Sequence, residues 1–221
     1  STFYTAKSEM SSSYQGKDEF YYPTYSGTVT TVKYTWWYLM IKDLGLELGV
    51  NNSLSGSSVS FGANDIKGLS YERIRAMGDN GTPDIIILYL GINDNAGGAS
   101  PETYEANYRT MLNRVKETYP NAFIFITNFS YSHYHIRMAS HGSYSEDTRL
   151  AYNEILDKLA SEYQVGLVHL SECWEVGVSP TQGDAGSLGY LGDNLHPSKK
   201  GMEVWAKQFE KDIKAYFGIT E

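Results

Sequence analysis

The sequence contains a single cysteine, Cys173, among its 221 residues. One cysteine excludes an intrachain disulfide and a cluster of metal-bound thiolates. No apolar run approaches the roughly 18 residues that a membrane-spanning helix needs, and the chain does not open like a signal peptide. A signal peptide could have been removed upstream of Ser1, so the compartment stays open between the cytoplasm and secretion.

Basic residues are few and dispersed. The chain has 18 Lys and Arg against 26 Asp and Glu, which gives a net charge of −8. No run of basic residues with interleaved aromatics occurs, so nucleic acids and anionic membrane surfaces are not expected partners. The chain also lacks a Gly-x-Ser-x-Gly elbow, a Walker A loop and a Gly-x-Gly-x-x-Gly fingerprint, which argues against classical α/β-hydrolases, NTPases and dinucleotide-binding proteins. We expect no cofactor.

Metal-ligand patterns are also scarce. His133, His135 and His141 lie close together, and His-x-His can bind zinc. No carboxylate or cysteine stands at ligand spacing beside them. We therefore expect no metal site, and expect these histidines to line a substrate cleft or to face solvent.

Helix and strand patterns alternate along most of the chain. Residues 1–34 are rich in Ser, Tyr, Gly and Thr and predict an extended loop region. Serines stand at capping positions before several helices, and Pro101 suits a first helical position. The pattern predicts helices over 35–44, 70–78, 100–120, 148–164 and 198–218, and strands ending near Asn52 and over 84–91, 121–128 and 165–170.

This alternation predicts one α/β domain over 1–221, with helices on both faces of a mainly parallel sheet. A chain of this length can bury a substantial core. Ligands of such sheets bind at the carboxyl ends of the strands. The loops that follow the predicted strands are therefore the candidate site.

Two of these loops carry residues suited to holding an oxyanion. In "LGINDN", Asn93 follows a buried strand and could donate its amide NH2 there, although an Asx turn explains the same residues. In "NNSLSGSS", Gly56 could let a backbone N–H approach a ligand closely. Small-residue loops are common, so Gly56 alone predicts little.

The segment "DNLHP" pairs an acid with a histidine. Asp193 could accept a hydrogen bond from Nδ1–H of His196, which would leave Nε2 as a general base. Pro197 favours an extended His196, and Ser198 can cap the helix that follows. A solvent-facing loop is the alternative interpretation of this pair.

Together the three segments resemble the SGNH (GDSL-like) hydrolase superfamily. That family shows Gly-Asp-Ser, an oxyanion glycine, Gly-x-Asn-Asp and Asp-x-x-His in this order. Gly56, Gly91 with Asn93 and Asp94, and Asp193 with His196 match its second, third and fourth blocks across nearly the whole chain. The resemblance implies a three-layer α/β/α fold of flavodoxin-like type.

The resemblance also implies residue roles. His196 would be the general base and Asp193 its orienting partner, while Gly56 and Asn93 would form the oxyanion hole. We expect Asp94 to brace its loop rather than react, and we group it with Tyr131 as a substrate-binding candidate. Tyr131, with Tyr134 and Trp174, could form an acyl or sugar platform or could pack structurally.

The first block is missing, because no Gly-Asp-Ser occurs in the chain. The opening "STF" resembles the residues that follow this block in relatives, so we expect the nucleophile and the first strand upstream of Ser1. Ser1 itself is the alternative nucleophile. A chain that truly lacked this strand would have unpaired strand edges and a large hole in its core.

These observations predict a serine-type ester hydrolase that acts on a small-molecule or carbohydrate acyl ester, such as an acetylated sugar. The rival hypothesis is a catalytically inactive module of the same fold that binds a carbohydrate or another ligand. The acyl chain length and the oligomeric state stay open.

Overall fold

Three short parallel strands form the sheet of this protein. A computed structural model describes residues 29, 31–54, 56–62, 67–132, 145–174, 189–191 and 195–219. The strands are β1 (Ile85–Leu88), β2 (Phe123–Thr127) and β3 (Gly166–Val168), in the order β1-β2-β3. Ile85 pairs with Phe123, and Phe125 pairs with Gly166. In the described part of the chain, β1 is therefore an edge strand.

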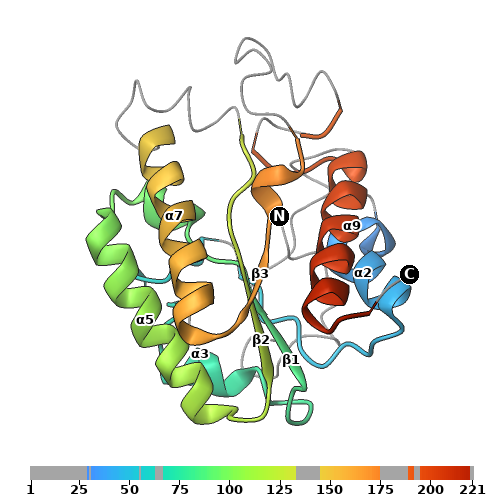
Figure 1. Ribbon diagram of the computed structural model, residues 1–221, viewed down its shortest axis with the longest axis horizontal. Coiled ribbons are helices and arrows are strands. Elements are labelled where there is room, and N and C mark those ends of the chain that lie inside the picture. Colours follow the sequence, from blue (N-terminus) through green and yellow to red (C-terminus); the bar gives the residue numbers. More distant parts are fainter. Residues whose placement is uncertain are drawn as a thin grey trace.

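Helices cover both faces of this sheet, as Figure 1 shows. On one side lie α3 (Tyr71–Ala76), α5 (Pro101–Thr118) and α7 (Glu146–Tyr163), and on the other lie α2 (Trp36–Leu44) and α9 (Lys199–Tyr216). The predicted three-layer α/β/α fold with a parallel sheet is confirmed. Shorter elements are α4 (Ile92–Ala96) and the 3-10 turns η2 (Val32–Tyr34) and η3 (Leu170–Glu172).

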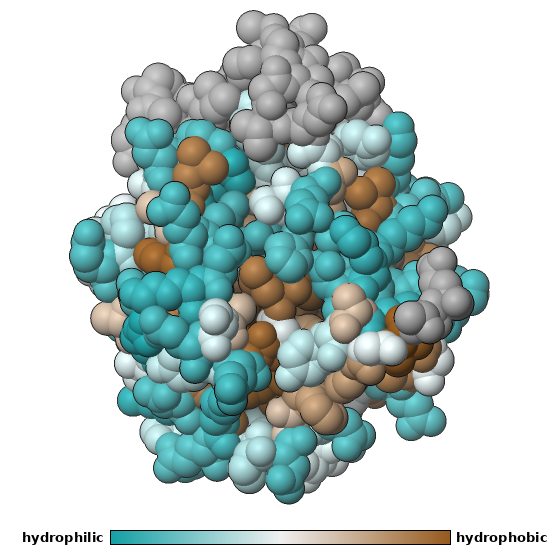
Figure 2. Space-filling view, viewed as in Figure 1, coloured by the Kyte–Doolittle hydropathy of each residue, from teal (hydrophilic) through white to brown (hydrophobic). Residues whose placement is uncertain are grey.

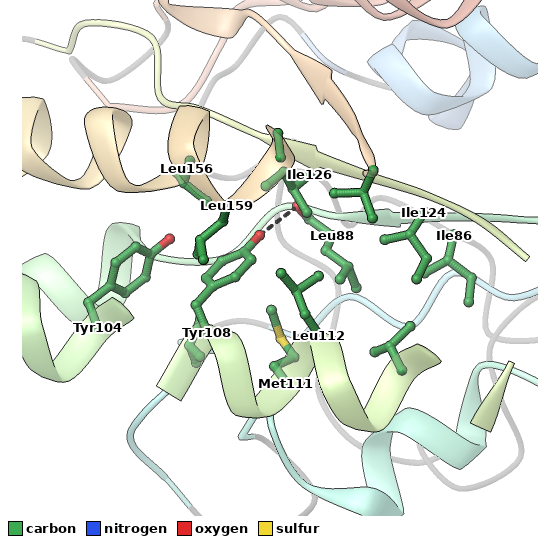
Figure 3. Packing of buried hydrophobic residues seen from close by; sticks show 14 of the residues in the cluster. Ile86, Leu88, Tyr104, Tyr108, Met111, Leu112, Ile124, Ile126, Leu156 and Leu159 are labelled. Atoms are coloured by element: carbon green, nitrogen blue, oxygen red, sulfur yellow. Dashed lines mark hydrogen bonds between the residues drawn. The ribbon is translucent and has the colours of Figure 1, made fainter. Parts of the chain in front are cut away.

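Each face of the sheet has its own apolar core. Toward α5 and α7, inward side chains such as Ile86 and Ile126 pack against Met111 and Leu156 (Figure 3). The Tyr108 hydroxyl, fully buried in this core, donates to the Leu88 carbonyl at 3.5 Å. The core between the sheet, α2 and α9 is rich in aromatic residues, since Trp36 stacks on Phe209 with ring centroids 4.0 Å apart and Trp205 and Trp174 stack nearby.

Serine caps explain why the long helices begin where they do. The side chains of Ser70, Ser100, Ser145 and Ser198 each accept a backbone N–H from the first turn of α3, α5, α7 and α9. Pro101 occupies the first turn of α5 as predicted. The helix α7 begins two residues before its predicted start because Ser145 provides the cap.

Two predictions of local structure are wrong. The strand expected to end near Asn52 is not formed, because residues 46–54 have no regular secondary structure and pair with no strand among the described residues. An apolar segment becomes a strand only beside a partner, and a cleft separates this one from β1. The helix α4 was expected as a loop, because its Asn and Asp residues are poor helix formers.

The surface of the molecule is largely hydrophilic. Figure 2 shows the face of Figure 1 covered mostly by polar side chains, with hydrophobic ones in patches at its centre and lower right. Large hydrophobic side chains exposed in the described residues include Phe61, Phe123, Leu150, Tyr216, Phe217 and Ile219. None of the described helices combines the length and the apolar character needed to span a membrane.

Candidate active site

The carboxyl end of β1 turns sharply into α4 at Gly91. Gly91 has a φ of 143°, which side chains rarely adopt, and an added Cβ would lie 2.5 Å from the Phe129 ring and 2.6 Å from the Tyr104 hydroxyl. Tyr104 is fully buried and donates its hydroxyl to the Leu90 carbonyl at 2.9 Å. Only glycine fits here, and the turn directs Asn93 and Asp94 toward the loop of Gly56.

Asp94 holds the neighbouring loop through its carboxylate. The Val59 and Ser60 backbone N–H groups donate to its two oxygens at 2.8 and 2.9 Å. Asp94 is completely buried, and this burial raises the pKa of its carboxyl, while the hydrogen bonds from Val59 and Ser60 act in the opposite direction. The geometry gives Asp94 the bracing contact that was expected and places its carboxylate away from solvent.

Asn93 reaches the same loop from α4. Its Nδ2 donates to the Ser57 carbonyl at 2.7 Å, and the residue is half-buried. The amide nitrogen carries two hydrogens, so this bond fixes the direction of the second. The loop is further tightened by the Ser58 hydroxyl, which donates to the Phe61 carbonyl and accepts from the Phe61 N–H.

Gly56 lies at the exposed tip of the loop, with a φ of 74° that favours glycine. The Arg73 guanidinium binds this loop through two hydrogen bonds. It donates to the Asn52 carbonyl at 2.8 Å and to Ser57 Oγ at 2.7 Å. Arg73 is buried, with 6% of its surface exposed. Both sides of Gly56 are thus tied to the body of the protein.

His196 belongs to a segment that is pinned against another loop. Pro197 forms an antiparallel bridge with Leu191, and the Ser198 N–H donates to the Tyr190 carbonyl at 2.8 Å. The Ser198 hydroxyl donates to the Gly189 carbonyl and accepts from the first turn of α9. The serine cap that "HPS" predicts is present at the start of α9, and His196 itself lies in a bend before it.

One cleft joins the predicted motifs. It has a volume of about 1070 Å³ and runs along the outer edge of β1, with α2 and residues 45–54 on its other side. Gly56, Asn93 and His196, far apart in the sequence, all line it. The site predicted from three separate loops therefore shares one cavity at the carboxyl end of β1.

Tyr131 and Trp174 are not brought to this cleft. Tyr131 is 2% exposed and packs in the core between the sheet and α9, and its carbonyl accepts the Trp174 indole N–H at 2.7 Å. The packing interpretation fits Tyr131 and Trp174 better than a substrate platform. Asp193, His133, Tyr134, His135 and His141 lie outside the described residues, so the Asp193–His196 contact stays a prediction.

Three contributors to the site were missed. Arg73, Asn52 and Ser57 form the network beneath Gly56, and Asn52 Nδ2 donates to the Arg73 carbonyl at 2.8 Å. The sequence does not indicate that Arg73 is buried and Arg75 exposed, because α3 is too short to show a clear hydrophobic period. Asn52 and Ser57 were noted only as parts of a small-residue loop.

Comparison with known proteins decides the family. A family model described as GDSL-like lipase/acylhydrolase matches residues 33–204. The chain belongs to this family. The assignment predicted from the three motifs is confirmed, and the family name agrees with the prediction of a carboxylic ester hydrolase.

Two curated relatives of this GDSL-like chain are esterases. The multidomain esterase of Ruminococcus flavefaciens is 25% identical over 63% of this chain and 17% of its own length. The arylesterase of Vibrio mimicus is 26% identical over 60% of this chain and 59% of its own. The match thus spans less than two thirds of either relative.

Among solved structures, the carbohydrate acetylesterase Est24 of Sinorhizobium meliloti shares the fold. It superposes with a TM-score of 0.65 over 83% of this chain and 86% of its own, at 16% identity. At this identity the likeness shows the fold alone.

Proposed function

We propose that this GDSL-like protein hydrolyses carboxylic esters in the cleft beside β1. The carrying observation is that Gly56, Asn93 and His196 line one cavity. In this proposal, Nε2 of His196 takes the proton of a serine hydroxyl as its Oγ bonds to the ester carbonyl carbon. The Gly56 N–H and the Asn93 amide hold the oxyanion, and Asp193 orients the imidazole.

The second half of the reaction uses the same groups. The protonated His196 returns its proton to the alcohol as the carbon–oxygen bond breaks, which leaves an acyl-serine. Water then attacks this acyl group while His196 accepts its proton. His196 returns that proton to the serine Oγ as the acyl–oxygen bond breaks, and the acid and the free serine are released. Each step is balanced without a cofactor.

The nucleophile is proposed to be a serine on an additional strand beside β1, upstream of Ser1. The cleft supports this, because it follows the outer edge of β1 and is lined there by apolar residues such as Ile85 and Ile87. A parallel strand in this place would pair with the edge of β1 that has no partner among the described residues, and would bury its apolar lining. Its carboxyl end would then lie beside the loops of Gly56 and Asn93. Ser1 stays the alternative.

An acetyl ester of a carbohydrate is the proposed substrate class. The support is the shared fold with a carbohydrate acetylesterase and the esterase names of both curated relatives. Since folds host many substrates, a panel of acetylated sugars and longer-chain esters provides the test. Preference for esters longer than about eight carbons would contradict the acetyl assignment.

Replacing His196 by Ala in the full-length natural protein tests the reaction itself. Hydrolysis of p-nitrophenyl acetate should fall on the order of 10³-fold or more, because the general base is lost. His169→Ala is the matched control, since His169 lies at the end of β3, its Nδ1 is 3.2 Å from the Asp212 carboxylate, and it does not line the cleft. A His196→Ala protein as fast as the His169→Ala protein would refute the proposal.

A further inference from the structure

Arg73 contacts the two sides of the Gly56 loop at once. Its Nη1 reaches Ser57 Oγ at 2.7 Å and its Nη2 reaches the Asn52 carbonyl at 2.8 Å. A guanidinium presents its donors in a rigid planar fork, so two bonds of this length fix the separation of both acceptors. Asn52 and Ser57 lie on either side of Gly56, so Arg73 fixes the distance between the two ends of the Gly56 loop.

The network continues from Arg73 to the second oxyanion candidate. Ser57 Oγ accepts from Arg73, and the Ser57 carbonyl accepts from Asn93 Nδ2 at 2.7 Å. Ser57 is buried, and its hydroxyl also donates to the Leu54 carbonyl at 2.7 Å. One residue thus lies between the guanidinium and the Asn93 amide, and any shift of Ser57 moves both proposed donors.

The network is also reciprocal on its other side. Asn52 Nδ2 donates to the Arg73 carbonyl, while the Asn52 carbonyl accepts from Arg73 Nη2. Asn52 and Arg73 therefore fix each other through one hydrogen bond in each direction. Its backbone N–H donates to the Ser70 cap, which ties this network to the first turn of α3.

We propose that Arg73 is a positioning residue that sets the Gly56 N–H and the Asn93 amide at the distance and angle an oxyanion requires. This inference rests on the proposed ester hydrolysis. Oxyanion donors stabilise the transition state far more than the bound ester, so a small displacement lowers kcat and leaves KM nearly unchanged. Arg73 acts through Ser57 and Asn52 and does not touch the reacting atoms.

The test is Arg73→Lys in the full-length protein, assayed with p-nitrophenyl acetate. Lysine keeps the charge but loses the planar fork, so kcat should fall by about 10- to 100-fold, the scale of a displacement of about 1 Å, with KM changed less than about twofold. Arg75→Lys is the matched control on the same helix. Arg75 is exposed, and its guanidinium lies 5.2 Å from the Tyr71 ring centroid, so kcat and KM should match the wild type.

Ser57→Ala gives an independent test, because it removes the acceptor of Nη1 and retains Arg73. Its kcat should fall in the same way, and the loss in the double variant should be smaller than the product of the single losses. Fully multiplicative losses, or a wild-type kcat in either folded single variant, would overturn the proposal. Should Arg73→Lys not fold, the kcat of Ser57→Ala decides alone.

A purely structural role for Arg73 predicts a different result. Inhibition by phenylboronic acid, which forms a tetrahedral adduct with a serine, should weaken in Arg73→Lys by the same factor as kcat/KM. A lowered melting temperature with unchanged boronate inhibition would contradict positioning. Full hydrolysis by His196→Ala would refute the proposed function itself. Loss of activity in His196→Ala but not in Arg73→Lys or Ser57→Ala would refute only the role assigned to Arg73.

Discussion

Asn93 and Asp94 are neighbours in the chain with different surroundings. Asn93 is half-buried at the cleft, whereas Asp94 is fully buried and its carboxylate accepts two backbone N–H groups from the adjacent loop. A carboxylate suits this place because it offers acceptors only. Asn93 therefore lines the cleft, while Asp94 holds the adjacent loop in place.

Asp94→Asn tests this division. An amide NH2 would face one of the two backbone N–H donors, which leaves a buried donor without an acceptor. We expect the free energy of unfolding in urea to fall by about 1–3 kcal/mol. Asp84→Asn is the control, since Asp84 is exposed. Equal stability of the two variants would contradict the bracing role.

Cys173 provides a test away from the site. Burial raises the pKa of its thiol from an ordinary 9.0 to about 12. Since the thiolate is the reactive form, iodoacetamide at pH 8 should label the folded protein roughly 10³-fold more slowly than the unfolded protein in urea, with labelling rising toward pH 12. Equal rates in the folded and unfolded states would show that the thiol is not protected.

The sequence predicts the site residues unevenly. Asn93 follows β1 and His196 precedes α9, so these two positions can be placed at one end of a parallel sheet from the sequence, whereas the strand expected before Gly56 is not formed. Arg73 is different, because its role comes from where its side chain points across 16 and 21 residues of separation. The direction in which a side chain points in the folded protein leaves no pattern in the sequence around it.

At the scale of elements, helices were predicted better than strands. Caps and hydrophobic period are local signals, so α5 and α9 begin where Ser100 and Ser198 indicate. A strand needs a partner, and residues 46–52 have the right composition but no neighbour among the described residues.

The start of α9 offers a test of how His196 is held. Gly201 packs against the 189–191 loop so closely that an added Cβ would lie 2.1 Å from the Tyr190 carbonyl oxygen and 3.0 Å from Pro197 Cβ. Alanine normally stabilises a helix over glycine by about 1 kcal/mol. Here we expect Gly201→Ala to destabilise the protein by about 1–3 kcal/mol, because the backbone must move.

The same substitution should reduce ester hydrolysis, since Pro197 and His196 move with the loop. Thermal unfolding measures the first effect and p-nitrophenyl acetate turnover the second. Gly49→Ala is the control for stability, because an added Cβ there meets nothing within 4 Å. A Gly201→Ala protein more stable than the wild type would contradict the described packing.

At the scale of the whole molecule, the cleft is the central feature. Its volume of about 1070 Å³ is at the upper end of ordinary ligand pockets, and it lies between the edge of β1 and residues 45–54. An additional strand would divide this space into a filled core below and a smaller substrate site above. The proposed additional strand would account both for this cleft and for residues 46–52, which pair with no strand among the described residues.

Labelling with a fluorophosphonate probe, followed by mass-spectrometric mapping of the modified residue, tests the central claim most directly. In the full-length natural protein we expect one serine to be labelled, upstream of residue 2, at a rate that falls on the order of 10³-fold or more in His196→Ala. Labelling that does not depend on His196, or that maps to Ser130 or Ser132 in the cleft lining, would contradict this account.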